Sequence, residues 1–125
     1  MSIAPLLNIN EYEAAYELYF IKATEQLHQH KRNLMNSFME FNSRRLNYLH
    51  PCYLNNPLIS DEDVEERSAD FNFLKDRLII AFNNLVNHCQ SWKFILDLDF
   101  INPYYKNILK VIIIDYNPIF ISLFL

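Results

Sequence analysis

The chain has 125 residues, of which 51% are hydrophobic and 15% aromatic, and its formal net charge is −4. This composition suits one folded domain with an apolar core, and it argues against disorder along the whole chain. Because general binders of nucleic acids or anionic membranes are usually basic, we expect neither as a partner.

The sequence contains no glycine. Glycine supplies the positive φ angles of hairpin turns and tight loops, so a β-rich fold of this size is disfavoured. Phosphate-binding loops, dinucleotide-binding fingerprints and nucleophile elbows also require glycine at fixed positions. The sequence therefore predicts an all-α fold, with no cofactor of these kinds.

The first predicted helix covers about residues 11–50, a stretch that contains no proline. Asn10 is the expected N-cap, with Glu13 at the capping-box position. Apolar residues recur here in alternating steps of four and three, which is typical of a coiled-coil-like seam. The candidates for core or interface positions on this seam are Tyr16, Phe20, Leu27, Leu34, Phe38 and Phe41.

A loop is predicted at 51–59, since Pro51 ends the first helix and Pro57 follows. The second long helix is predicted at about 61–98. Ser60 is its expected N-cap and Asp63 occupies the capping-box position. Its seam candidates are separated by multiples of seven residues: Phe71, Leu78, Leu85 and Trp92.

A short third helix is predicted at about 103–114, because Asn102 suits the N-cap and Pro103 the first helical position. An apolar tail follows at 118–125. Lys110 and Asp115 interrupt the longer apolar run at 108–125, so we expect no membrane span. Peripheral lipid contact by the tail is the alternative to packing on the helical bundle or on a partner. The residues expected to pack on the bundle or on a partner are Ile112, Ile113, Phe120, Leu123 and Phe124.

These elements predict a single domain, residues 1–125, in which two long amphipathic helices form an antiparallel hairpin beside the short helix. Apolar residues off the seam widen each stripe beyond the need of a two-helix pair. We therefore expect a protein partner, either a second copy in a homo-oligomer or a helical hetero-subunit. The alternative is a compact monomer whose long helices break near Arg44-Arg45 or Asn83-Asn84.

Few residues suggest chemistry. Glu25 and His28 have the ExxH spacing of di-iron bundles, but the second long helix has no such motif, so we expect no metal site. His88 and Cys89 are neighbours whose side chains diverge on a helix, which disfavours a catalytic dyad. We expect no catalytic residue and no enzyme. His30 lies on the seam, either as a polar residue that fixes register or as a pH switch.

The two cysteines, Cys52 and Cys89, lack the spacing of a zinc or redox motif. We expect reduced thiols in an intracellular, cytoplasmic protein, because the N-terminus lacks the pattern of a signal peptide. The preferred hypothesis is a non-catalytic helical interaction subunit, a scaffold or adaptor. The alternative is a small helical inhibitor, immunity or effector protein that binds one target through the acidic segment 61–66. A metal-binding helical-bundle enzyme is a third hypothesis.

Overall fold

The all-α fold is confirmed by the computed structural model, which describes residues 9–48 and 58–124. The two long helices are α1 (Ile9–Tyr48) and α3 (Asp61–Trp92). They are followed by α4 (Pro103–Tyr116) and by the 3-10 helix η2 (Pro118–Phe124). The described residues contain no β-strand.

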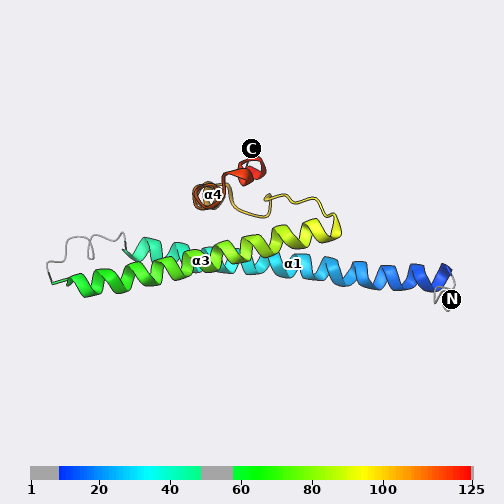
Figure 1. Ribbon diagram of the computed structural model, residues 1–125, viewed down its shortest axis with the longest axis horizontal. Coiled ribbons are helices and arrows are strands. Elements are labelled where there is room, and N and C mark those ends of the chain that lie inside the picture. The colour runs from blue at the N-terminus through cyan, green and yellow to red at the C-terminus, as the bar shows by residue number, and fades with distance from the viewer. Residues whose placement is uncertain (1–8, 49–57, 125) are drawn as a thin grey trace.

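The long helices pack against each other in opposite directions, and α4 lies across them near the middle of the hairpin (Figure 1). Both helices are continuous, so neither Arg44-Arg45 nor Asn83-Asn84 is a break. Since the hairpin does not fold back on itself, the structure departs from the compact-monomer alternative on this point.

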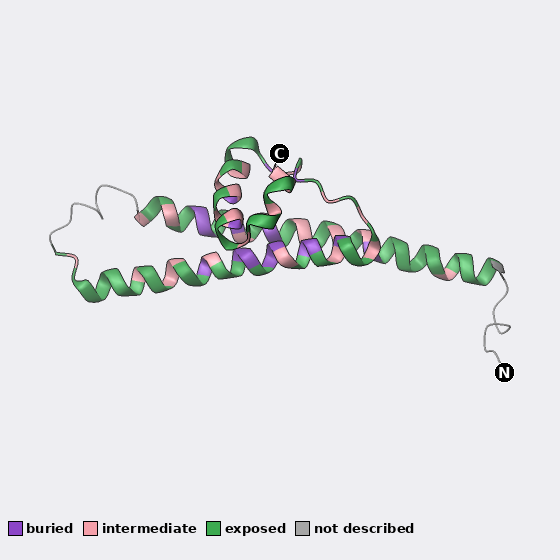
Figure 2. Cartoon of the chain, turned by 45° about the horizontal axis from the view of Figure 1, so that its top comes forward, coloured by how far each residue is buried: buried purple, intermediate pink, exposed green. Residues whose placement is uncertain are grey.

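The core lies where the three α-helices meet. Its largest side chains with almost no exposure are Phe38 and Leu34 from α1, Leu78, Phe82 and Leu85 from α3, Leu98, and Leu109 and Ile113 from α4. The buried segments of the hairpin are concentrated beneath α4, and both ends of the hairpin are largely exposed (Figure 2). The C-terminal helices therefore cover only the central part of the long hairpin.

The apolar tail packs on the bundle, as predicted. The Phe82 ring meets Phe120 edge-on, with centroids 5.2 Å apart, and stacks on Phe124 at 6.4 Å. The other residues predicted to pack there, Ile112, Ile113 and Leu123, also join the core cluster or contact it. Among the helices in residues 9–48 and 58–124, none is long and apolar enough to cross a membrane.

Two of the predicted helix starts are confirmed. At α3, the Asp63 amide donates to the Ser60 hydroxyl oxygen at 3.2 Å and the Ser60 amide donates to the Asp63 carboxylate at 3.3 Å. At α4, Asn102 accepts from the Tyr104 amide. The N-cap predicted at Asn10 was wrong, because Asn10 lies inside α1 (Ile9–Tyr48).

The end of α3 differs from the prediction, since the helix stops at Trp92 and not at about Leu98. Lys93 adopts a left-handed conformation, with φ 54° and ψ 33°, and the Phe94 amide donates to the Cys89 carbonyl at 2.9 Å. Such a helix end usually has glycine at the left-handed position. The chain then continues without helix to α4 and buries Leu98 on the way.

Replacing Lys93 by glycine is expected to raise the free energy of unfolding by about 0.5–1 kcal/mol, because glycine has no Cβ to oppose a left-handed conformation. Urea unfolding at neutral pH measures this change. Lys75→Gly, inside the same helix, is the matched control and should lower stability by about 1 kcal/mol. A destabilised Lys93→Gly protein would contradict the assigned helix end.

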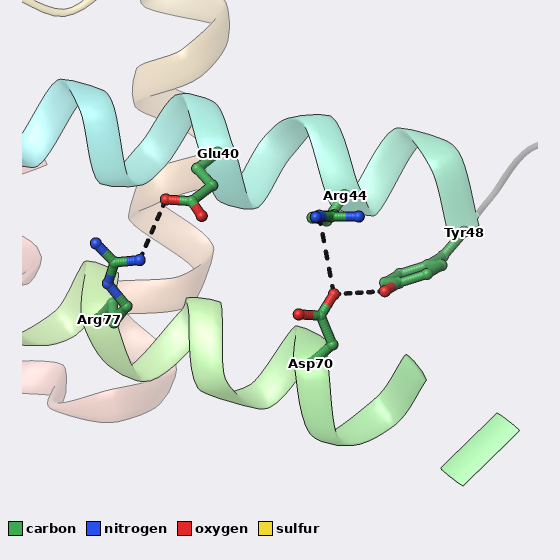
Figure 3. Close-up of polar contacts among 5 residues, drawn as sticks. All are labelled: Glu40, Arg44, Tyr48, Asp70 and Arg77. Atoms are coloured by element: carbon green, nitrogen blue, oxygen red, sulfur yellow. Dashed lines mark hydrogen bonds and ion pairs between the residues drawn. The ribbon is translucent and has the colours of Figure 1, made fainter. Parts of the chain in front are cut away.

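Polar side chains link α1 and α3 across the hairpin, from Glu40 toward Tyr48 at the end of α1 (Figure 3). Arg77 pairs with Glu40 at 3.4 Å, and Arg44 with Asp70 at 3.9 Å. The Tyr48 hydroxyl donates to Asp70, and this hydrogen bond raises the pKa of Tyr48. Both ion pairs are well exposed, so each adds at most about 1 kcal/mol, and their main effect is to align the helices.

Candidate interaction surface

The N-terminal part of α1 extends beyond the end of α3 (Figure 1). The two helices differ in length, 40 residues in α1 and 32 in α3, and they are also staggered, because Tyr48 at the end of α1 contacts Asp70 well after the start of α3 at Asp61. Residues 10–22 of this extension are called the α1 arm. None of their side chains is buried, whereas Ala23 directly after them is 0% exposed. The arm is therefore a helical projection from a packed hairpin.

The arm carries the same apolar stripe as the buried part of α1. Eighteen residues make five helical turns, so Tyr16 points the same way as Leu34, and Phe20 the same way as Phe38. Leu34 and Phe38 are 0% and 1% exposed under α3 and α4, whereas Tyr16 and Phe20 are 65% and 43% exposed. The stripe thus continues past the point where the described part of the chain covers it.

The base of the arm marks where this cover ends. The Phe20 ring meets Phe94 edge-on at 5.7 Å and stacks on Tyr16 at 6.3 Å. His88 Nε2 lies 2.8 Å from the Ala23 carbonyl oxygen. Phe94 lies two residues beyond Trp92, the last residue of α3, so this ring contact is made just past the end of that helix.

Acidic side chains border the stripe. Glu13 and Glu17 are exposed along one edge, and Lys22 lies on the opposite side of the helix. Within the described residues, neither Glu13 nor Glu17 belongs to an ion pair. The helix dipole favours acidic residues in the first helical turn, but Glu17 lies beyond that turn. The arm is thus an aromatic surface with an acidic margin.

The ten predicted seam residues fall into three groups. Those with almost no exposure are Leu34, Phe38, Phe41, Leu78 and Leu85. Those that are partly buried are Leu27, Phe71 and Trp92. Tyr16 and Phe20 are exposed on the arm. The spacing thus identified the seam residues of both helices, and the structure divides the α1 stripe into a core segment and an exposed segment.

A pair of histidines occupies the seam next to the arm. The rings of His30 and His88 face each other across the hairpin, with centroids 4.9 Å apart. A carbonyl oxygen only accepts, so the hydrogen bond to Ala23 places a proton on His88 Nε2. Burial, and then the charge of His88, lower the pKa of His30. Each residue was visible in the sequence, but their pairing depends on the helix register.

The other candidates from the sequence do not form a recognisable site among the described residues. Glu25 and His28 are both exposed, and no group of three or more potential metal ligands occurs in residues 9–48 and 58–124. The acids of segment 61–66 are exposed at the start of α3, where Asp63 forms the capping box. Cys89 is buried, which raises the pKa of its thiol. Cys52 lies outside the described residues, so its pairing and the intracellular location stay predictions.

Comparison with known proteins supplies no relative. No protein-family model matches the chain, and no curated protein or solved structure matches it. The function is therefore inferred from the surface of the molecule itself.

Proposed function

We propose that the chain is a non-catalytic helical interaction subunit, a scaffold or adaptor, that binds a protein partner through the apolar stripe of the α1 arm. The observation that supports this function most is the exposure of Tyr16 and Phe20 on the helical face where Leu34 and Phe38 are buried. A contiguous exposed apolar patch with a polar margin is typical of a protein-binding surface.

The chemistry of the stripe suits protein recognition. Tyrosine is enriched at the energetic centres of interfaces, because its ring buries a large apolar area while its hydroxyl keeps a hydrogen-bond partner. Tyr16, Tyr19 and Phe20 are exposed within little more than one helical turn. Burying such side chains contributes roughly 25 cal/mol for each Å² of apolar surface removed from water.

The arm is also presented in a defined conformation. It belongs to a helix that continues without interruption into the core at Leu34 and Phe38, so the hairpin anchors one end of it. Because the helix is already nucleated at its anchored end, the cost of ordering the arm on association is reduced. An amphipathic helix presented in this way is recognised through residues spaced by three and four positions.

Photo-crosslinking inside the cell that makes the protein tests this proposal. A photoreactive phenylalanine analogue at Tyr16 is expected to join the chain to a defined protein, identified by mass spectrometry. The same analogue at Leu46, which is 52% exposed at the other end of α1, is the matched control. Efficient crosslinking from Leu46 with none from Tyr16 would contradict the arm as the binding surface.

A further inference from the structure

We infer that the partner segment that binds the α1 arm is an amphipathic α-helix whose apolar face is bordered by basic residues. This inference rests on the proposed function and adds the chemistry of the partner. It follows from two independent features of the arm, the continuity of its stripe with the α1–α3 interface and the charge along its margin.

The continuity of the stripe points to a helix. From Leu34 to Phe41 the stripe is packed against a helix, α3, that runs in the opposite direction. On the arm the same face carries Tyr16 and Phe20 at the same spacing, so a helix in line with α3 meets the same arrangement of side chains. Among the described residues, the chain beyond Trp92 turns away toward α4, and the ring contact of Phe94 with the arm is made at Phe20, at its base.

The charge of the margin points to a basic partner. Glu13 and Glu17 border the stripe on one side, and the described residues supply neither with an ion pair. Basic residues beside the apolar face of the partner would meet these carboxylates at the rim of the contact. Complementary charge of this kind favours one partner over another and speeds association.

The same charges disfavour a second copy of the arm. The arm contains Glu11, Glu13 and Glu17 against one base, Lys22, and the whole chain is acidic as well. In an antiparallel pair of arms, equivalent flanks face each other, which brings the Glu17 flank of one copy to the Glu17 flank of the other. Like charges placed opposite each other oppose association.

Two synthetic peptides of about 20 residues test the inference on the full chain, since shorter isolated helices are only marginally stable. Both carry the same leucine face, with lysine along the flanks of one and glutamate along those of the other. By calorimetry at low salt, the lysine peptide is expected to bind about tenfold tighter or more. Equal binding of the two peptides would overturn the inference.

Variants locate the binding. Tyr16→Ser with Phe20→Ser should abolish it, while Leu46→Ser should leave it unchanged. Glu13→Gln with Glu17→Gln should remove most of the preference for lysine. Because segment 61–66 is also acidic, Glu62→Gln with Glu65→Gln is the control, and this variant should keep the preference. A preference lost only in that control would place the basic contact on α3 and overturn the inference.

The failures of the two proposals are distinguishable. A dimer in light scattering that the Tyr16 and Phe20 variant abolishes would make a second copy the occupant of the arm. That result overturns the basic-helix inference and leaves the arm as a protein-binding surface. Crosslinking of position 16 to an acidic or non-helical protein segment would likewise overturn the basic-helix inference and leave the arm as a protein-binding surface. Crosslinking only from Leu46 contradicts the proposed function itself.

Discussion

Phe82→Ala is expected to lower the free energy of unfolding by about 3–5 kcal/mol, which is a large part of the stability of a domain this size. Phe82 is 0% exposed, and its ring contacts Phe120 and Phe124 of η2. The substitution removes buried apolar surface and leaves a cavity at the junction of the hairpin with the C-terminal helices. Urea unfolding followed by circular dichroism measures the change.

Phe73→Ala is the matched control for this experiment. Phe73 lies on the same helix but is 59% exposed, and its ring lies 5.8 Å from the Arg77 guanidinium. Losing this exposed contact should cost no more than about 1 kcal/mol. Equal effects of the two substitutions would contradict the packing of η2 on Phe82.

Stability is expected to fall as the pH drops below about 6.5, the ordinary pKa of histidine, and the histidine pair should account for part of the loss. The pKa of His30 is lowered in the folded protein, first by burial and then by His88. Below about pH 6.5 the unfolded chain therefore binds a proton at this position more readily than the folded chain. The contribution of neutral His30 is complete above that pH and decreases toward acid.

The measurement is urea unfolding between about pH 7.5 and pH 5, which spans the ordinary pKa of histidine. His30→Gln should show a smaller loss of stability toward acid than the unmodified chain. On α3, the hollow beside His30 is lined by Arg77, Ile80, Ala81 and Asn84, none of which is acidic. His28→Gln, at an exposed position, is the control. Identical pH profiles for His30→Gln and the unmodified chain would contradict this account.

Much of the fold could be predicted because its signals are local. The capping pair Ser60 and Asp63, and the Asn102-Pro103 start of α4, act within a few residues of the sequence, and both starts are where they were expected. The absence of glycine and the seam spacing were enough to predict an all-α hairpin.

The end of α3 could not be predicted from the same signals. Lys93 takes a conformation for which glycine is the usual indication, and the apolar residues Ile95, Leu96 and Leu98 continue beyond it. A prediction from apolar spacing alone therefore placed the end of the helix too late. In the folded chain Leu98 lies in the non-helical connection between α3 and α4, and its apolar side chain is buried in the core.

The candidate surface depends on this unpredicted helix end. Tyr16 and Phe20 were identified as seam residues, but spacing does not distinguish a covered seam from an uncovered one. Their exposure follows from the register of the hairpin and from the length of α3. The His30–His88 pair depends on the same register, which no short-range pattern of the sequence specifies.

Amide hydrogen exchange, at a concentration where light scattering gives the 15.0 kDa monomer, tests the central claim most directly. A helix end without tertiary cover opens readily, so amides of residues 10–22 should exchange much faster than those near Leu34 and Phe38. The lysine-flanked peptide should slow the exchange of the arm and leave the core unchanged. Arm amides as protected in the free monomer as those of the core would show that the chain covers the arm itself, and would contradict its role as a binding surface.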